Sequence, residues 1–254
     1  MSSLPSGGAA DKLPPWVTCL DVEEQEAGHY EDHVNEALLQ AVQAAPARVL
    51  ELGCASGAFG ARLKQRFPSA HVIGIEAGRG AAAHAATRLD RVINARIEDV
   101  DFATEGIAPQ SLDLLVAGDV LEHLVNPWAV LKRARPFLAG EGRVVASIPN
   151  ARNLQVSGEL LINGRFTYDE RGLLDITHLR FFTFEEIRAM FEQTGYALES
   201  FVVNLSPRLS KLYHEHAGKG EVTLKLGRMT LEGVTQRELT ELCAEQFILR
   251  ARPA

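Results

Sequence analysis

The chain has 254 residues, of which 46% are hydrophobic and 23% are charged, an ordinary composition for a globular enzyme with a sizeable core. Its formal net charge is −7 at pH 7, which argues against a nucleic-acid partner because such an interface needs a basic surface. The longest apolar runs fall well short of the ~18 residues that span a bilayer, so we expect no membrane association.

The N-terminal segment and the cysteines indicate the compartment. The chain opens with Ser, Gly and Pro and lacks the apolar core of a secretory signal, so we expect a flexible tail over 1–28 and one domain over 29–254. Cys19, Cys54 and Cys243 have neither disulfide-framework nor zinc-ligand spacing. We therefore expect a cytoplasmic protein.

From residue 34 onward, helical patterns alternate with short apolar runs. Val34, Leu38 and Val42 recur at helical spacing. Similar spacings follow at 59–67 and 124–137. Buried strands are predicted for the apolar runs at 48–52, 71–75, 91–93, 112–117 and 143–148.

This alternation predicts right-handed crossovers and an α/β, Rossmann-like, mostly parallel sheet with helices on both faces. Ligands of such sheets bind beyond the carboxyl ends of the strands. The functional loops are therefore expected directly after Leu52, Ile75, Ile93, Ala117 and Ile148.

After residue 150 the pattern changes. Residues 151–182 have no clean period but many aromatic and charged residues, which favours an ordered lid inserted after the fifth strand. Thr183 and Glu186 form a capping-box pattern that predicts a helix ending near Gly195. Strand patterns at 197–203 and 246–251 complete the chain, and no second domain is expected.

The segment at 49–60, VLELGCASGAFG, predicts a strand, a glycine-rich turn and a helix. Gly53 and Gly57 permit a sharp turn and a close approach of a ligand to the main chain, and Ala55 stands where a third glycine is usual. Glu51 precedes the turn, and Glu76 ends the second strand, where an acid can bind ribose hydroxyls. The alternative is a tight connection without a ligand.

Two kinds of cofactor fit a glycine-rich turn of this type. The dinucleotide pattern G-x-G-x-x-G fails, because Ala55 and Ala58 occupy its second and third glycine positions. A pyrophosphate would also lie near the acidic Glu51, whereas a positively charged sulfonium cofactor is attracted by it. The pattern therefore favours an adenosyl methyl donor over a nicotinamide dinucleotide.

The sequence resembles the class I S-adenosylmethionine-dependent methyltransferases over residues 29–253. The resemblance is carried by ELGCASG at 51–57, LDLLVAGDVLEHLVNPWAVL at 112–131, GRVVASIPNARN at 142–153 and QFILRARP at 246–253. LLDITHLRFFTFEEIRAMFEQTGY at 173–196 is typical of a bacterial subgroup linked to polysaccharide or specialised-metabolite pathways.

This resemblance implies a seven-stranded sheet, S-adenosylmethionine as cofactor and S-adenosylhomocysteine as product. Glu51, Gly53, Ala55, Gly57, Glu76 and Asp119 are then expected to bind the cofactor. In the subgroup an Asp near the adenine amine follows the third strand, but here Arg96 stands at that place, and it cannot accept a hydrogen bond. Glu98, Asp99, the backbone of Ile97 or packing alone then holds the adenine.

Methyl transfer to an oxygen usually needs a base as well as alignment. Asp119 and His123, four residues apart, follow the fourth strand, and His178 lies in the expected lid, so these three are the catalytic candidates. Each histidine can instead be structural. Glu122 is expected to point elsewhere, to solvent or to an internal pair.

Acceptor contacts are expected from Asn150, Tyr168, Arg180 and Phe182, with Phe166 and Phe181 as further aromatic candidates. Arg180 can instead pair with an acid such as Asp175. Histidine spacing suggests no metal ligand set, and His214 and His216 are expected to form a surface pair.

The favoured function is O-methylation of a small-molecule acceptor, most simply a hydroxyl of a sugar or specialised metabolite. The sequence barely separates this from N- or C-methylation. A non-catalytic, cofactor-binding partner of a biosynthetic enzyme is a further alternative, favoured only by Arg96, and a nicotinamide oxidoreductase is the remotest. A homo-oligomer or a complex with a biosynthetic enzyme is compatible with the sequence.

Overall fold

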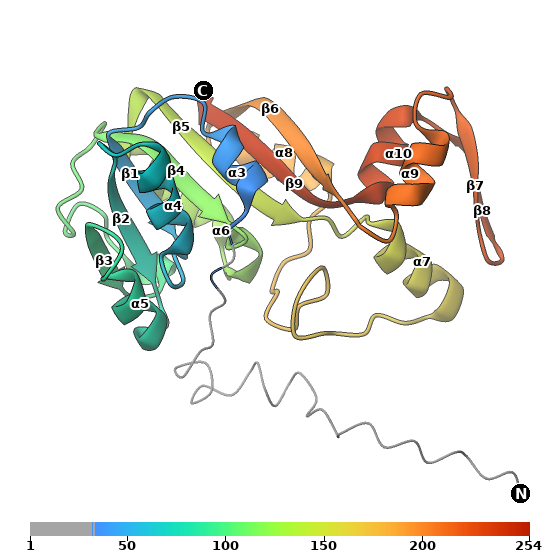
Figure 1. The fold of residues 1–254 in the computed structure, drawn as a ribbon, viewed down its shortest axis with the longest axis horizontal. Coiled ribbons are helices and arrows are strands. Elements are labelled where there is room, and N and C mark those ends of the chain that lie inside the picture. Colours follow the sequence, from blue (N-terminus) through green and yellow to red (C-terminus); the bar gives the residue numbers. More distant parts are fainter. Residues whose placement is uncertain (1–31, 33) are drawn as a thin grey trace, which may run out of the picture.

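The computed structural model describes residue 32 and residues 34–254, so the expected tail over 1–28, and with it Cys19, lies outside the described residues. The first part alternates strands and helices as the sequence predicts (Figure 1). Its elements are α3 (Glu36–Ala41), β1 (Arg48–Leu52), α4 (Ala58–Arg66), β2 (His71–Glu76), α5 (Arg79–Ala85), β3 (Arg91–Asn94), η1 (Ile97–Asp99), β4 (Leu112–Gly118), η2 (Leu121–His123), α6 (Pro127–Ala134), η3 (Arg135–Phe137) and β5 (Leu138–Pro149).

The second part is less regular. Its elements are α7 (Leu154–Asn163), α8 (Phe184–Gln193), β6 (Tyr196–Leu205), α9 (Ser210–His216), β7 (Val222–Leu226), β8 (Met229–Val234), α10 (Gln236–Cys243) and β9 (Ala244–Pro253). This part adds α7, α9, α10 and the β7–β8 hairpin to the predicted helix and the two predicted strands. Among the described helices, none combines the length and the apolar character needed to cross a membrane.

Seven strands form one sheet in the order β3-β2-β1-β4-β5-β9-β6. The first five strands are parallel, and β9 runs antiparallel between β5 and β6. The predicted seven-stranded, mostly parallel sheet is therefore confirmed. The strand order reverses between β1 and β4, and Leu52 pairs with Ala117 at their carboxyl ends. The loops after these two strands thus flank the switch point where ligands bind in such folds.

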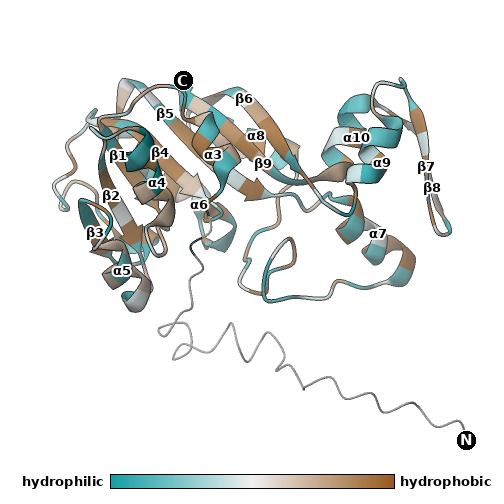
Figure 2. Cartoon of the chain, in the orientation of Figure 1, coloured by the Kyte–Doolittle hydropathy of each residue, from teal (hydrophilic) through white to brown (hydrophobic). Residues whose placement is uncertain are grey.

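Two hydrophobic layers cover the two faces of the sheet. One layer joins α3 and α4 to the sheet through residues such as Leu38 and Leu63. The other joins α6 and α8 through residues such as Leu131 and Ile187. Each fully buried aliphatic side chain contributes roughly 1.5–3 kcal/mol. Figure 2 shows many hydrophobic residues along the central strands and clearly hydrophilic stretches on α9 and α10.

The helix predicted after Thr183 is confirmed as α8. The Thr183 side chain accepts a hydrogen bond from the Glu186 N–H, and Gly195, with φ of 86°, follows the helix. The apolar face of α8 is buried, namely Phe184, Ile187, Met190 and Phe191. Local sequence signals were sufficient to predict this helix, because its cap, its apolar face and the glycine that follows it all lie in one short segment.

A small lobe forms beyond one end of the sheet from α7, α9, α10 and the β7–β8 hairpin (Figure 1). Leu154, Leu224, Leu239 and Leu242 belong to its own hydrophobic cluster. The sequence analysis does not anticipate this lobe, because its core residues come from short segments separated by turns. Part of the expected lid segment is the regular helix α7, and a long irregular connection leads from it to α8.

Candidate active site

The glycine-rich turn after β1 has an unusual backbone. Gly53, Ala55 and Gly57 all have positive φ values, of 64°, 46° and 77°. A Cβ on Gly53 would lie 2.6 Å from Cγ2 of Val120, so this position needs glycine for its conformation and for its space. Ala55 holds a left-handed conformation that disfavours side chains, which explains why glycine is usual there.

Glu76, at the end of β2, fastens this turn. Its Oε2 accepts a hydrogen bond of 2.9 Å from the Ala55 N–H, and its Oε1 accepts one of 2.7 Å from the Gly78 N–H. A carboxylate has lone pairs for further donors, so these two bonds leave capacity for ribose hydroxyls. Glu76 therefore holds the turn in shape at the place where the sequence analysis expects the ribose.

Glu51 is buried behind the turn and lines a cavity of about 110 Å³ together with Gly53, Ala55 and Asp119. Its Oε2 has no hydrogen-bond partner among the described residues. Burial raises the pKa of Glu51 to about 8, and the charge of Glu76 acts in the same direction. An unpartnered buried acid is what a cationic ligand would complement, so the residues present fit a sulfonium cofactor with an amino-acid tail.

The residues expected to contact adenine already take part in hydrogen bonds within the chain. The Ile97 carbonyl accepts a hydrogen bond of 2.7 Å from Arg133. Glu98 accepts one of 2.8 Å from the Asn126 N–H, and its other oxygen lies 3.4 Å from Arg96. Glu98 thus fixes the start of α6, a structural role that the sequence analysis missed. Its contact with adenine stays a prediction.

A second cavity, of about 390 Å³, lies beside the first and shares Asp119 with it. Asp119 has a φ of 48°, and its N–H donates to the carbonyl (3.1 Å) and the hydroxyl (3.0 Å) of Ser147. The Gln246 amide donates a hydrogen bond to the Asp119 carboxylate. Asp119 is therefore held between the two cavities by β5 and β9.

His123 lines the second cavity, and one of its ring nitrogens is already hydrogen-bonded to Thr177. Its Nδ1 lies 3.0 Å from the Thr177 hydroxyl and 3.2 Å from the Thr177 carbonyl. The Thr177 hydroxyl donates its proton to Asp175 at 2.6 Å, so Nδ1 of His123 is the donor toward Thr177. Nε2 is then the unprotonated nitrogen of the neutral ring.

Glu122 and His178 also line this cavity. The sequence analysis expected Glu122 to face solvent or an internal pair, and its exposure of 1% excludes the first of these alternatives. Neither carboxylate oxygen has a hydrogen-bond partner among the described residues, and His178 is the internal partner at a longer distance. Oε1 of Glu122 lies 4.0 Å from Nε2 of His178, and the rings of His178 and His123 are 4.7 Å apart.

Burial shifts the pKa values of both Glu122 and His178. Desolvation, reinforced by the charges of Asp119 and Asp175, raises the pKa of Glu122 well above its ordinary value. Burial and the neighbouring His123 lower the pKa of His178 to about 4, so His178 is neutral at physiological pH. Perturbed titratable groups that converge in a cavity mark a functional site.

Comparison with known proteins agrees with this geometry. A family model described as a methyltransferase domain matches residues 22–200, more than half of the chain. The chain belongs to this methyltransferase family. S-adenosylmethionine is accordingly its cofactor, as the buried, unpartnered oxygen of Glu51 suggests independently.

Two curated relatives match parts of the methyltransferase. A malonyl-[acyl-carrier protein] O-methyltransferase of Geobacter sulfurreducens is 28% identical over 63% of this chain and 59% of its own. A trans-aconitate 2-methyltransferase of Methylobacterium nodulans is 36% identical over 42% of this chain and 40% of its own. The chain therefore spans about half the length of the curated relatives that it matches.

Solved structures share the fold at low identity. A methyltransferase of Mesorhizobium loti has a TM-score of 0.54 and 14% identity, covering 85% of this chain and 96% of its own. A methyltransferase of Archaeoglobus fulgidus has a TM-score of 0.52 and 16% identity, covering 81% of this chain and 85% of its own. These likenesses support the fold of the methyltransferase.

Two residues expected at the acceptor have structural roles. Asn150 is completely buried, and its amide donates to the carbonyls of Glu241 (2.6 Å) and Ala244 (2.9 Å). Phe182 is 3% exposed and packs against Trp128. Each side chain thus joins the end of β5 or the segment before α8 to the core, and the contacts of both with an acceptor stay predictions.

Three other aromatic residues form a row of ring contacts that begins at His178. Phe181 stacks edge-on between His178 and Phe166, and Phe166 also contacts Tyr168. These three aromatic residues remain partly exposed, and Phe181 adjoins the second cavity through its contact with His178. Arg180 donates to the backbone carbonyls of Leu179 and Val125, which replaces the expected pair with Asp175. Tyr168 and Arg180 as acceptor ligands stay predictions.

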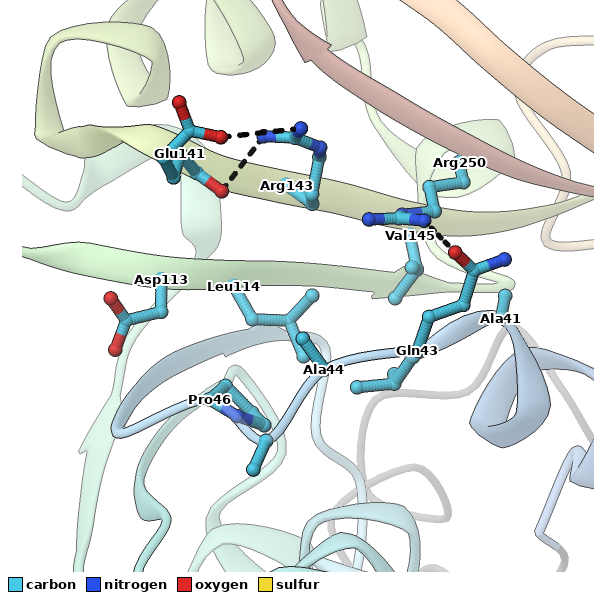
Figure 3. A pocket seen from close by; sticks show the side chains of 12 residues that line it. Ala41, Gln43, Ala44, Pro46, Asp113, Leu114, Glu141, Arg143, Val145 and Arg250 are labelled. Carbon is cyan, nitrogen blue, oxygen red and sulfur yellow. Dashed lines mark hydrogen bonds and ion pairs between the residues drawn. The ribbon is translucent and has the colours of Figure 1, made fainter.

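A further cavity, of about 310 Å³, lies near the amino end of β4 (Figure 3). Its lining includes Asp113 near the start of β4 and Arg143 in the first half of β5. Asp113 accepts hydrogen bonds from two backbone N–H groups, and Arg143 pairs with Glu141 and Glu199. The charged side chains of this cavity are already paired, and the cofactor turn lies at the opposite, carboxyl ends of the strands. This cavity therefore does not belong to the active site.

Proposed function

We propose that this chain transfers the methyl group of S-adenosylmethionine to a hydroxyl oxygen of a small, uncharged acceptor such as a sugar or a hydroxylated specialised metabolite. The observation that carries the proposal is the position of Asp119, which lines both the cavity of the glycine-rich turn and the cavity of the two histidines. A methyl donor in the first cavity would thus meet an acceptor in the second at this residue.

The charge of the second cavity supports a neutral acceptor. Among the described residues, four acids line it, namely Asp119, Glu122, Asp175 and Glu245, and no Lys or Arg does. A carboxylate acceptor would be repelled there. The two curated relatives are named for malonyl-[acyl-carrier protein] and trans-aconitate, so we infer an acceptor different from theirs. The same acidic lining favours a cationic amine as the second candidate, which would make the reaction N-methylation.

The proposed reaction is an in-line displacement. The acceptor oxygen forms a bond to the methyl carbon, the bond from that carbon to sulfur breaks, and the sulfonium becomes a neutral thioether. The hydroxyl proton leaves to the cluster of His123, His178 and Asp119, which we propose as the catalytic residues. The rest of the rate enhancement comes from alignment of the two substrates and exclusion of water.

The test begins with cofactor binding. Calorimetric titration with S-adenosylmethionine and S-adenosylhomocysteine should give micromolar affinity, and Glu76→Ala should weaken it by ~10-fold or more, because the turn loses two hydrogen bonds and the ribose loses its acceptor. Glu232→Ala, which removes an exposed acid of the lobe, is the matched control and should bind like the wild type.

Acceptor screening follows with polyols and sugars, amines, and carboxylates, and mass spectrometry detects the added methyl group. Transfer to hydroxyl compounds, lost in a His123→Asn and His178→Asn double variant that still binds cofactor, is the expected result. Transfer confined to carboxylates would contradict the proposal, and transfer confined to amines would establish the second candidate.

A further inference from the structure

We infer that Glu122, His123 and His178 form a binding site for a divalent transition-metal cation in the wall of the acceptor cavity. Each residue offers one ligand atom, and these three atoms all lie within 4.8 Å of one another. Spacing along the chain could not reveal this set, because His178 reaches the other two only through the fold. The inference deepens the proposed function and rests on it for its catalytic part alone.

The strongest observation is the state of the Glu122 carboxylate. It is 1% exposed, and both of its oxygens lack a hydrogen-bond partner among the described residues. A buried carboxyl group without a partner costs free energy, and proteins retain such groups where they bind a cation or act in catalysis. The Glu122 backbone is well satisfied, since its carbonyl accepts from the N–H groups of Leu179 and Arg180, so the side chain is fixed in this position.

The surroundings of His123 provide the second, independent observation. Its Nδ1–H is directed at Thr177, whose hydroxyl donates to Asp175. Metal-bound histidines are oriented in this manner, with one ring nitrogen donating to an oxygen and the other left free for the metal. Thr177 and Asp175 therefore prepare Nε2 of His123 as a ligand, while Nε2 of His178 already faces Glu122.

The donor set indicates the kind of cation. Two imidazoles and one carboxylate suit Zn²⁺ and similar transition metals, whereas Mg²⁺ prefers oxygen ligands. Tetrahedral coordination at ~2.0–2.2 Å would draw the three donor atoms together by roughly 1 Å. The open fourth position would face the cavity, and the nearby carboxylates of Asp119 and Asp175 would add favourable negative charge.

Such a cation would act on the acceptor hydroxyl. A hydroxyl oxygen at the fourth position would be polarised and would lose its proton more readily. The proton would pass to Asp119 at the junction of the two cavities, and the oxygen would bond to the methyl carbon as the bond from that carbon to sulfur breaks, with no change in the charge of the cation. The step needs no oxidant or reductant.

The decisive experiment measures Zn²⁺ binding to the full chain, without methyl donor or acceptor. Chelator-treated protein is titrated with Zn²⁺ in competition with a chromophoric chelator, and Mg²⁺ is tested in excess as a competitor. We expect one Zn²⁺ per chain, insensitive to Mg²⁺, with affinity reduced ~100-fold in Glu122→Gln and in His178→Asn. Asp175→Asn should reduce it about tenfold, because His123 loses its orienting group.

His84→Asn, an exposed histidine on α5, is the matched control and should bind Zn²⁺ like the wild type. Circular dichroism establishes that each variant is folded. Folded wild type without stoichiometric Zn²⁺ binding, or equal affinity in the wild type, Glu122→Gln and His178→Asn, would overturn the site.

Activity separates the two proposals. Methyl transfer that disappears on metal removal and returns with Zn²⁺ supports both. Undiminished transfer by metal-free protein removes the catalytic part of the inference and leaves the proposed function intact. Zn²⁺ bound at this site without transfer to any acceptor would contradict the proposed function and leave the metal site standing.

Discussion

The cofactor half and the acceptor half of this methyltransferase are built in different ways. The cofactor cavity is lined mainly by one turn after β1, with Asp119 from the loop after β4. The acceptor cavity takes residues from five separate stretches of the chain, around 119–123, 149, 172–178, 204 and 245–246. Sheet topology alone places the first set, whereas long-range packing is needed to place the second.

This difference predicts two kinds of response to mutation. In the cofactor half, a substitution acts through backbone geometry and charge at a single turn. In the acceptor half, adjacent residues can have opposite roles, because one side chain faces the core and the next faces the cavity. The variants below test this contrast, in order of expected effect.

The largest effect is expected at Gly53. Gly53→Ala should weaken S-adenosylmethionine binding by ~100-fold and lower the free energy of unfolding by ~3 kcal/mol, because the residue has positive φ and its new Cβ would meet Val120 at 2.6 Å. Gly106→Ala is the control, since Gly106 also has positive φ but open space around it, and should cost only ~1 kcal/mol. Calorimetry and denaturant unfolding measure both. Equal losses in the two variants would show that the close contact with Val120 has no influence.

The next effect is a pH dependence set by Glu51, whose pKa is raised to about 8 by burial. At neutral pH this acid is mostly protonated, and a cationic cofactor favours the ionised form, so binding releases a proton. Affinity for S-adenosylmethionine should therefore rise about tenfold between pH 6.5 and 9. Titration in buffers of different ionisation enthalpy measures the released proton. Glu51→Gln should flatten the profile, and an unchanged profile in that variant would assign the dependence to another group.

The smallest effect on activity is expected from a neighbouring pair of aromatic residues. Phe181→Ala should raise the KM for the acceptor by ~5-fold with little change in stability, since Phe181 is partly exposed beside His178. Phe182→Ala should instead lower the free energy of unfolding by ~3 kcal/mol, since Phe182 is in the core. Steady-state kinetics and thermal unfolding separate the two. The reverse pattern would mean that the acceptor enters from another side.

The sequence was sufficient for the sheet, the α8 helix and the cofactor turn. Each of these depends on signals within one element: an apolar run, a cap, or glycines directly after a strand. Asp119 and His123 could also be placed, because they follow β4 directly, although their catalytic roles stay predictions.

The rest of the site depended on contacts that no local pattern encodes. Glu122 faces the cavity because η2 turns it inward toward His178, and Asn150 is withdrawn because its amide binds the end of α10. The lobe was missed for the same reason, since its core assembles from α7, α9, α10 and a hairpin that are each too short to identify alone.

The point where the lobe joins the sheet has a consequence for protein engineering. β6 and β9 are antiparallel neighbours, and the segment between them leaves and returns at adjacent positions, where the Ser206 N–H donates to the Cys243 carbonyl at 2.9 Å. A different segment grafted between these two residues would leave the strand pairing intact. This part of the lobe can therefore be exchanged as a cassette while every lining residue of the acceptor cavity is kept, provided that Gln246 still reaches Asp119.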